Sequence, residues 1–475
     1  MPHGGAVRGR GADVTALFDP LRLAEVAWDV TCVNASSAQV LRQRQQTRLA
    51  ALFEASRAAP IYRRHLADRP AADIALTDLP VVHKHTLMRH FDAWVTDPAL
   101  RLPQLQAFTA DPRRIAQPYL GKYQVWESSG TSGTPAIFVQ DARAMAVCDA
   151  LEALRRAAPR TLYGWPDPSL LGQRVAFVGE IDGHFASVVS VLRLRELNPW
   201  LAPALQVFSI AQPIDSLVAQ LNAFAPSVIA TYPSAAAMLA DEAARGALRL
   251  DLREVLTGGE TLGASVRQHI AQQLGCRVRS SYGASEFLAM GWECAEGRMH
   301  LNADWVILEP VDRQHRPVPA GTRPHTVLLT NLSNHVQPLI RYDLGDEVTF
   351  AADACACGSP LPVIDVAGRH DDALVMAGRG KRSVTLLPLA LSTVLEDDAG
   401  VFDFQLRQRD AHTLVLRLGE RGKAAVSAAA RCHTALQAFC ADQGVERLRV
   451  VSELDVALAR GRSGKVQRIV AQPGG

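Results

Sequence analysis

Short runs of β-branched residues alternate with longer helical segments between about residues 120 and 290 of this chain. We expect strands at residues 137–139, 174–178, 227–230, 254–256 and 277–280, with helices between them that include residues 142–158 and 262–274. This alternation predicts a largely parallel sheet covered by helices. Because ligands of such sheets bind beyond the carboxyl ends of the strands, we expect the functional residues in the turns that follow them.

The rest of the chain has a different pattern. A single helical segment is expected at residues 24–58, and short strands dominate later, at residues 305–308, 326–329 and 347–350. After Asp371 the expected order is strand, helix, two strands, helix, strand. The predicted fold class is therefore α/β. We expect a disordered N-terminus at 1–20, then a large N-terminal domain at 21–370 with helix-covered, mostly parallel sheets and a β-rich subdomain. A small mobile α+β domain at 371–475 completes the prediction.

Length and charge exclude several classes of protein. A chain of 475 residues is long enough for two domains with large cores. The formal net charge of +2 is too small to favour nucleic acid or an anionic membrane as a partner. The N-terminus is rich in Gly and Arg and lacks an apolar core segment, so we expect no signal peptide. Pro226 and Pro233 interrupt the longest uncharged stretch, which argues against a membrane span, and we expect a cytoplasmic protein.

One loop in the alternating region is rich in Ser, Thr and Gly. It reads Ser128-Ser129-Gly130-Thr131-Ser132-Gly133-Thr134-Pro135 and is expected to be a turn between two strands. Glycine lets the backbone approach a ligand closely, and Ser and Thr add donors to the backbone N–H groups. No Gly-Lys-Ser/Thr closes the loop, so it is not a Walker A motif. The loop is a candidate polyphosphate site, although its composition is also typical of a flexible loop.

Three of the eight cysteines and one histidine have the spacing of a metal site. Cys294 lies six residues before His300, and Cys355 and Cys357 follow in a Cys-Ala-Cys-Gly sequence. Three thiolates and one imidazole suit the closed tetrahedral shell of a structural zinc ion. Two unrelated cysteine pairs are the alternative interpretation.

Five further motifs follow the Ser/Gly/Thr loop in a fixed order. They are Gly258-Gly259-Glu260, Tyr282-Gly283-Ala284-Ser285-Glu286, Arg341-Tyr342-Asp343-Leu344-Gly345-Asp346, Gly368-Arg369-His370-Asp371-Asp372 and Gly464-Lys465-Val466-Gln467-Arg468. Together with the loop, they resemble the motifs of the adenylate-forming superfamily and, within it, the phenylacetate–coenzyme A ligase family. The resemblance covers nearly the whole chain from about Pro60 onward. Relatives in this family place a zinc ion at the same Cys…His…Cys-x-Cys order.

The resemblance implies an enzyme that activates a carboxylic acid with ATP. The loop Ser128, Ser129, Gly130, Thr131, Ser132, Gly133 and Thr134 would grip the triphosphate, and Glu286 would hold magnesium. Tyr282 and Gly283 would lie on one side of the adenine, with Gly259 and Glu260 along the other. Asp346 would accept hydrogen bonds from the ribose hydroxyls, with Asp343 as the rival, and Arg369 would reach the ribose or a phosphate.

The resemblance also implies roles for two C-terminal residues, one in adenylate formation and one in the rotation of the small domain. Lys465 would neutralise charge in the transition state of adenylate formation. Asp371 would be the hinge about which the small domain rotates before thioester formation.

The sequence departs from the family pattern at two places. Thr134 occupies a position where relatives usually carry Lys, and residues 378–388 lack the usual Gly-x-Asn-x-x-Pro. The second departure concerns a segment that helps to form the coenzyme A tunnel in relatives.

The acyl pocket is the least readable part of the sequence. Candidate lining residues are Tyr232, Pro233, His184, Phe185 and Ala284. Aromatic and small side chains around a dry cleft favour a compact aromatic or short acyl acid, although each of these residues is equally typical of a core.

We therefore predict an AMP-forming acid–thiol ligase that makes an acyl adenylate and then an acyl-coenzyme A from an aryl or arylacetic acid. Its cofactors and substrates would be ATP, Mg²⁺, coenzyme A and a structural Zn²⁺, and a homodimer is expected. One alternative passes the acyl group to an amine or to a carrier-protein thiol. The other is a non-catalytic nucleotide-binding module.

Overall fold

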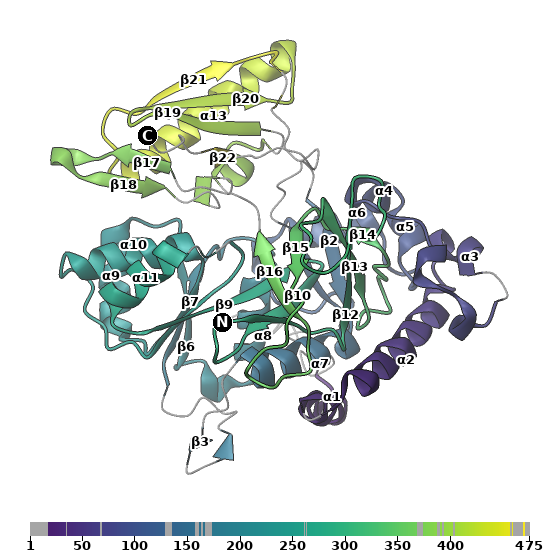
Figure 1. Cartoon of the computed structure of the whole chain (residues 1–475). Helices are drawn as coiled ribbons and strands as arrows, with labels where there is room; N and C mark the ends of the chain where they lie inside the picture. Colours follow the sequence, from purple (N-terminus) through teal and green to yellow (C-terminus); the bar gives the residue numbers. More distant parts are fainter. Residues whose placement is uncertain are drawn as a thin grey trace, which may run out of the picture.

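The computed structural model describes residues 18–34, 36–66, 69–128, 135–156, 161–162, 165–166, 173–260, 262, 264–367, 374–386, 390–391, 394–401, 404–456, 458 and 469–470. Its largest sheet has nine strands in the order β15-β16-β11-β10-β9-β8-β7-β5-β6. Figure 1 shows this sheet in the lower part of the molecule, with the last part of the chain above it. The predicted α/β fold class is confirmed.

Half of the large sheet is parallel, as the alternating pattern predicts. Its strands are β5 (Val175–Gly179), β6 (Leu205–Ser209), β7 (Val228–Thr231), β8 (Glu254–Thr257) and β9 (Arg277–Ala284). Residues in β5, β7 and β8 are buried almost continuously, as expected for strands covered by helices on both faces. The covering helices are α8 (Ala186–Leu197), α9 (Ile214–Phe224), α10 (Pro233–Ala244) and α11 (Ala264–Leu274) (Figure 1). The sequence did not predict β6, and β9 continues beyond its expected end at residue 280.

The other half of the large sheet is antiparallel. After β9 it contains β10 (Phe287–Glu293), β11 (Met299–Leu301), β16 (Val363–Ala367) and β15 (Glu347–Phe350). A separate three-stranded sheet consists of β12 (Val306–Val311), β13 (Thr326–Asn331) and β14 (Tyr342–Asp343). The predicted β-rich region is therefore divided, because the expected strand at 347–350 joins the large sheet.

The N-terminal part contains two long helices where one was expected. These are α1 (Pro20–Val33) and α2 (Ala38–Ser56). Ser37 starts the second helix as its N-cap, where its hydroxyl accepts a hydrogen bond from the N–H of Val40. The expectation of one continuous helix at 24–58 is wrong, because a capping serine within an apolar pattern begins a new helix. Shorter helices follow, α3 (Pro60–Leu66), α4 (Lys84–Arg89), α5 (Phe91–Trp94), α6 (Leu102–Thr109) and then α7 (Ala142–Leu151).

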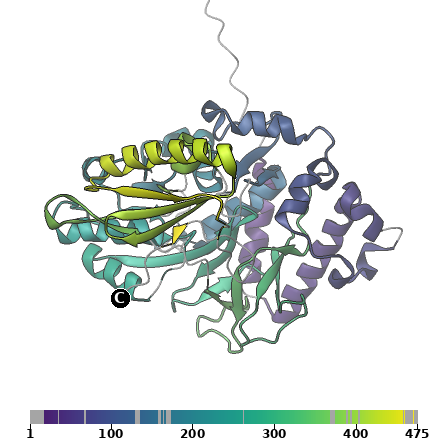
Figure 2. The ribbon, with the colours of Figure 1, turned by 90° about the horizontal axis from the view of Figure 1, so that it is seen from above.

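The C-terminal unit, which we define as the described residues from 374 to 470, has its own apolar core. It contains the hairpin β17 (Leu374–Ala377) and β18 (Ser383–Leu386), and the four-stranded sheet β21 (Arg449–Glu453), β20 (Thr413–Leu418), β19 (Phe404–Asp410) and β22 (Ile469–Val470). Helix α13 (Gly422–Asp442) lies along this sheet (Figure 2). The unit contacts the parallel half through Gln443, whose Nε2 donates to the carbonyls of Ala211 and Gln212 at 3.2 and 3.1 Å.

A buried ion pair joins the segment after α7 to the loop after β11. Nη1 and Nη2 of Arg155 donate to the two oxygens of Asp304 at 2.6 and 2.8 Å, and Nη1 also donates to Asn302 at 2.9 Å. Both charged side chains are almost completely buried. Arg48 Nη1 also lies 4.0 Å from Asp304, so Arg155 is the nearer of two cations that compensate this buried carboxylate.

Arg155→Met is expected to lower the free energy of unfolding by about 3–5 kcal/mol, because it leaves the buried Asp304 carboxylate without its bidentate partner. Urea denaturation followed by tryptophan fluorescence measures this change. Arg101→Met breaks an exposed pair with Asp92 at 2.8 Å and serves as the matched control, with an unchanged unfolding midpoint. Equal shifts for the two variants would contradict this account of the buried pair.

Candidate active site

The two ends of the predicted phosphate loop are held close together by a hairpin. Strands β1 (Gln124–Glu127) and β2 (Ile137–Gln140) pair in antiparallel fashion, as the sequence predicts for the flanks of the loop. The N–H of Ser128 donates to Ala136 O at 2.8 Å, and the Ser128 hydroxyl accepts from Ala136 N at 2.9 Å. The remaining predicted loop residues, Ser129 to Thr134, lie outside the described residues. The described flanks therefore fix where this loop begins and ends.

Lys84 is a candidate that the sequence analysis did not identify. Its Nζ donates to the Ser128 hydroxyl at 3.0 Å, so an ammonium group lies at the start of the predicted phosphate loop. Lys84 is the first residue of α4, and the preceding Val82 forms a bridge to Tyr342. A single lysine between two histidines carries no signal in the sequence, and only the folded chain shows this contact.

The ends of β7 and β8 bring two predicted motifs together. Their last residues, Thr231 and Thr257, are direct neighbours, so Tyr232 and Gly259 follow at the same edge of the sheet. Gly259 has a φ of 81°, and a Cβ at this position would lie 3.2 Å from the Tyr232 ring. Glycine is required here both for the backbone conformation and for the close approach of the ring.

Tyr232 is an uncharged aromatic residue that is partly exposed, although its hydroxyl is buried. Burial raises the pKa of its hydroxyl, and the carboxylates of Glu180 and Glu260 raise it further. The phenol therefore stays protonated at neutral pH. Pro233, the first residue of α10, follows it and is buried.

The Tyr282–Glu286 motif forms the end of β9 and the turn into β10. Tyr282, Gly283 and Ala284 belong to the strand, whereas a turn had been expected there. A Cβ on Gly283 would lie 1.9 Å from the Leu288 carbonyl oxygen, so the approach of the two strands requires glycine. The register between β9 and β10 shifts at this point, which is typical of a bulge that reorients a functional side chain.

Two hydrogen bonds from tyrosine hydroxyls position the two predicted carboxylates. Tyr342 Oη donates to Glu286 Oε1 at 2.8 Å, and Tyr282 Oη donates to Asp346 Oδ2 at 2.9 Å. Glu286 is 7% exposed and Asp346 is 8% exposed. The indole of Trp126, on β1, donates to Ser285 O at 2.8 Å and so joins this turn to the strand before the phosphate loop. The predicted magnesium ligand, the adenine-side tyrosine and the ribose carboxylate thus lie in one connected group.

The hydrogen bonds of the two carboxylates in this loop distinguish Asp346 from Asp343. Asp343 Oδ1 accepts hydrogen bonds from the Thr326 hydroxyl at 2.6 Å and from Gly345 N at 3.1 Å. Asp343 therefore shapes the loop, whereas Asp346 contacts Tyr282 at the predicted nucleotide site. This difference favours Asp346 as the ribose ligand, as the resemblance implies.

His184 and Phe185 lie beside the start of the phosphate loop. The N–H of Glu127 donates to His184 O at 2.7 Å, and Glu127 forms a parallel bridge with Phe185, the N-cap of α8. The His184 ring packs edge-on to Phe108, with ring centroids 5.4 Å apart. Burial lowers the pKa of His184, so the ring is neutral at neutral pH. Ala284 lies on the neighbouring β9, and these residues can supply a largely uncharged wall.

Three predicted residues, Arg369, Asp371 and Lys465, lie outside the described residues. The segment just after Lys465 is described again at β22, which pairs in parallel with Leu406 and Arg407 of β19. The chain that follows the predicted catalytic lysine is thus part of the C-terminal sheet.

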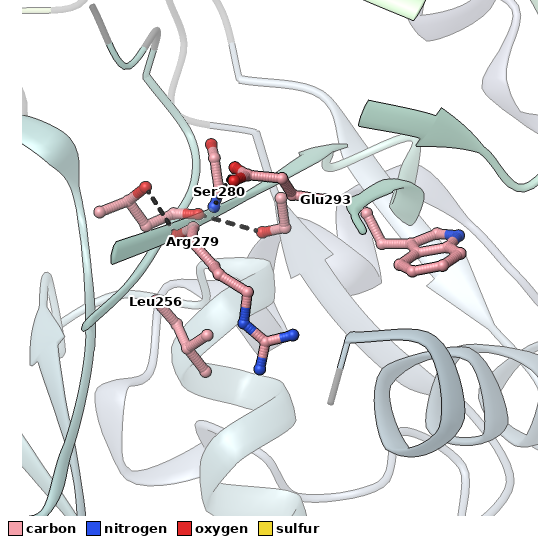
Figure 3. Close-up of a pocket in the computed structure, with 7 residues that line it drawn as sticks. Leu256, Arg279, Ser280 and Glu293 are labelled. Atoms are coloured by element: carbon pink, nitrogen blue, oxygen red, sulfur yellow. Dashed lines mark hydrogen bonds between the residues drawn. The ribbon is translucent and has the colours of Figure 1, made fainter. Parts of the chain in front are cut away.

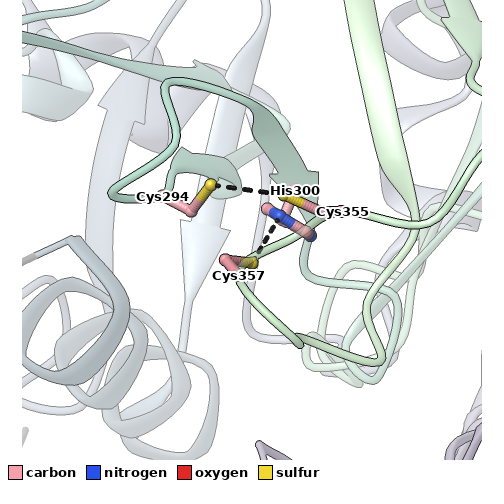
Figure 4. A group of neighbouring side chains, drawn as sticks. All are labelled: Cys294, His300, Cys355 and Cys357. Carbon is pink, nitrogen blue, oxygen red and sulfur yellow. Dashed lines mark hydrogen bonds between the residues drawn. The ribbon is translucent and has the colours of Figure 1, made fainter.

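The predicted zinc ligands form a compact cluster (Figure 4). One donor atom from each of Cys294, His300, Cys355 and Cys357 lies within 4.8 Å of the others. The Cys294 and Cys355 sulfurs are 3.7 Å apart, and the Cys357 sulfur is 3.3 Å from His300 Nε2. Zinc–sulfur bonds of about 2.3 Å separate two sulfurs in a tetrahedral shell by about 3.8 Å, so this spacing fits zinc. It is far too long for a disulfide, whose sulfurs are about 2.05 Å apart.

The His300 ring is oriented for metal binding by a second contact. Its Nδ1 lies 2.9 Å from Leu361 O, which leaves Nε2 directed toward the cysteines. A backbone carbonyl that takes the other ring N–H is the usual support of a metal-binding histidine. The alternative of two unrelated cysteine pairs does not describe this arrangement, because all four side chains meet at one point.

A small hollow lies between β8, β9 and β10 (Figure 3). It is lined by Leu256, Thr257, Arg279, Ser280, Ser281, Trp292 and Glu293. Arg267 donates to both Glu293 oxygens at 2.8 and 2.7 Å, and Ser280 N donates to Glu293 at 2.9 Å. The Glu293 carboxylate is thus held by neighbouring groups, and the hollow lies between the strands that lead to the predicted nucleotide motifs.

No family model matches this sequence. A phenylacetate-coenzyme A ligase of Thermus thermophilus is 31% identical over 181 residues, which are 36% of this chain and 39% of that protein. The match thus spans about two fifths of the relative's length. Among the described residues, no helix has both the length and the apolar character needed to cross a membrane.

Solved structures of a 2-hydroxyisobutyryl-CoA ligase share the fold. The complex with 2-HIB-AMP and CoA in the thioesterification state has a TM-score of 0.57 and 22% identity, and the comparison covers 92% of this chain and 91% of that chain. The postadenylation complex with R3-HIB-AMP has a TM-score of 0.51 and 21% identity, with coverage of 90% and 89%. These findings confirm the predicted resemblance: part of the chain is similar in sequence to a phenylacetate-coenzyme A ligase, and the chain shares its fold with the 2-hydroxyisobutyryl-CoA ligase structures.

Proposed function

We propose that this chain is an AMP-forming acid–thiol ligase. The observation that carries the proposal is the connected group of Tyr282, Glu286, Tyr342 and Asp346, in which each predicted nucleotide-site carboxylate accepts a hydrogen bond from a tyrosine. The partial similarity to a phenylacetate-coenzyme A ligase supports the same chemistry. The alternative of a non-catalytic nucleotide-binding module is disfavoured, because such a module has no need of Glu286, Asp346 and Lys465 together.

The reaction follows from the roles of these residues. A carboxylate oxygen of the acid attacks the α-phosphorus of ATP, and the bond to pyrophosphate breaks. Lys465 neutralises the charge that grows on the α-phosphate, and Asp346 orients the nucleoside through its ribose hydroxyls. The thiolate of coenzyme A then attacks the acyl carbonyl, and AMP leaves. Bound magnesium would supply further charge neutralisation, and Glu286 offers the hard oxygen ligand that this ion prefers.

Lys84 belongs to the same proposal. Thr134 occupies the position where related loops usually carry a lysine, so the loop itself lacks one positive charge. The ammonium of Lys84 lies 3.0 Å from the Ser128 hydroxyl at the start of that loop. We infer that Lys84 supplies the missing charge to the β- and γ-phosphates from a different part of the chain.

We propose an aryl or arylacetic acid as the substrate. The candidate wall consists of Tyr232, Pro233, His184, Phe185 and Ala284 and carries no charge at neutral pH, because burial keeps Tyr232 protonated and His184 neutral. Such a wall suits a flat apolar group whose only charge is the reacting carboxylate. Residues 378–388 depart from the family pattern in a segment that helps to form the coenzyme A tunnel in relatives. An amine or a carrier-protein thiol is therefore the rival acceptor.

Three further features complete the proposal. We expect a division into domains at 21–370 and 371–475, with rotation about Asp371 between the two half-reactions. We expect a structural zinc ion at Cys294, His300, Cys355 and Cys357, since the donor set and spacing fit this ion. We also expect a homodimer, which light scattering of the purified protein measures.

Pyrophosphate release is expected only with a matching acid, and acyl-coenzyme A should appear by mass spectrometry when coenzyme A is present. Lys465→Ala should lower the adenylation rate by about 100-fold or more, because charge on the α-phosphate is then uncompensated. Lys423→Ala, an exposed lysine of α13 in the same C-terminal unit, is the control and should leave the rate unchanged. Amide formation without coenzyme A turnover would select the rival acceptor, and a Lys465→Ala rate within about tenfold of wild type would exclude the mechanism.

Lys84→Met should raise the KM for ATP by about tenfold or more, because a charge-assisted contact of about 1.5–3 kcal/mol is lost. Steady-state kinetics with varied ATP measures the effect, and the KM for the acid should stay constant. Arg89→Met removes an exposed cation from the same helix and is the control. If both variants change the KM for ATP equally, the effect comes from general surface charge and the role of Lys84 is disproved.

Protein purified without added metal should contain about one zinc ion per chain, because four ligands of this type bind zinc tightly. Cys355→Ser should reduce the zinc content measured by mass spectrometry and lower the melting temperature. Cys276→Ser changes a cysteine outside the cluster and should retain the metal. Full zinc content in a Cys355→Ser, Cys357→Ser double variant would refute this site.

A further inference from the structure

Three metal-ligating side chains from distant parts of the chain meet at a second point on the molecule. They are His83, just before α4, His315, in the turn between β12 and β13, and Asp343, in β14. One donor atom from each lies within 4.8 Å of the others. His83 and His85 are close in sequence, but the chain near them offers no third metal ligand. In the folded chain, His315 and Asp343 lie beside His83 as two further candidate ligands.

Backbone contacts independent of any metal hold the three segments. Val82 N donates to Arg341 O at 3.1 Å, and Asp343 N donates to Val82 O at 2.9 Å, so His83 and Asp343 lie on paired segments. The turn with His315 is closed by Asp312, whose Oδ1 accepts from Gln314 N at 2.8 Å and from Arg316 N at 3.0 Å. The backbone thus places these ligands close together before a cation arrives.

His83 and Asp343 form an ion pair whose spacing also fits two ligands of a shared cation. His83 Nδ1 is 3.4 Å from Asp343 Oδ2. A charge-assisted N–H···O bond is about 2.7–2.9 Å long. Two ligands in a tetrahedral shell with bonds of about 2.0–2.1 Å are about 3.4 Å apart. The hydrogen bonds from Thr326 and Gly345 to Asp343 Oδ1 turn the other oxygen toward His83, as the outer contacts of a metal-binding carboxylate do.

Two arginines close in sequence to the proposed ligands pair with carboxylates outside the group. Arg316 pairs with Asp312 at 2.8 Å, and Arg341 pairs with Glu309 at 3.2 Å. The His85 ring stacks on His83 with centroids 5.8 Å apart, but His85 does not belong to the group of donors. The side chains of His83 and Asp343 are 42% and 22% exposed, so a cation can enter from solvent.

We propose that His83, His315 and Asp343 form an exchangeable site for a divalent transition-metal ion, separate from the cysteine cluster. Two imidazoles and one carboxylate suit Zn²⁺, Ni²⁺ or Co²⁺, whereas Mg²⁺ and Ca²⁺ prefer oxygen ligands alone. Three protein ligands leave room for water. The ion would join the start of α4, which carries Lys84, to the loop that carries Asp346. It would thereby tie together two segments that are separate in sequence.

Calorimetric titration of Ni²⁺ into the full-length protein, purified with its own zinc, tests the proposal without any measurement of turnover. We expect saturable binding to one class of site. His83→Asn and His315→Asn should each weaken it by at least about tenfold, while His85→Asn should leave it unchanged. Asparagine suits position 315, where φ is 57°, because it tolerates this conformation.

Two further readouts identify the site. Bound Co²⁺ should lack the strong thiolate charge-transfer absorption of a cysteine site, and Ni²⁺ should raise the melting temperature of the wild type but not of His315→Asn. Equal Ni²⁺ affinity in the wild type and in both histidine variants would overturn the proposal, as would the absence of saturable binding. Failure of the ligase assays would leave these binding results unaffected, so the two proposals are tested separately.

Discussion

The pairing of β9 with a parallel neighbour on one side and an antiparallel neighbour on the other determines how this molecule is built. Its parallel bonds to β8 continue the helix-covered half of the sheet, and its antiparallel bonds to β10 begin the other half. The strand ends at Ala284, so the turn with Glu286 emerges where the two halves meet. Gly283 makes this junction possible, because any side chain there would collide with the Leu288 carbonyl. The site therefore depends on one backbone approach that only glycine permits.

From this junction, hydrogen bonds extend to the other parts of the candidate site. Tyr282 connects β9 to Asp346, Tyr342 connects β14 to Glu286, and Trp126 connects β1 to Ser285. Each bond satisfies a nearly buried polar group, which would otherwise be costly to remove from water. The same contacts that stabilise the packing of the two sheets thus hold the carboxylates in fixed positions. Carboxylates held in fixed positions by hydrogen bonds are suited to orient an extended nucleotide.

The N-terminal segment from Val82 to Lys84 links the two proposals. Val82 pairs with the Arg341–Asp343 segment, Lys84 reaches the phosphate-loop flank, and His83 lies between them beside Asp343. A cation at His83, His315 and Asp343 would lie next to the proposed nucleotide site without being part of it. The cysteine cluster is different in kind, because its four candidate ligands would complete the tetrahedral shell of a zinc ion and leave no position for water.

Much of the fold was predictable from sequence, because local patterns determine it, whereas the membership of the site stays a prediction. Alternating β-branched and helical segments predicted the parallel half of the sheet, and the motif order predicted the adenylate-forming fold. Spacing suggested the cysteine cluster but left unrelated cysteine pairs equally open. The break between α1 and α2 was missed, because an apolar helical pattern continues across the capping Ser37.

Only the tertiary structure decided which distant side chains meet: Lys84 with Ser128, Tyr282 with Asp346, and His83 with His315 and Asp343. Such contacts depend on how whole strands and loops pack against one another. No short stretch of sequence determines the distance between side chains that are far apart in the chain.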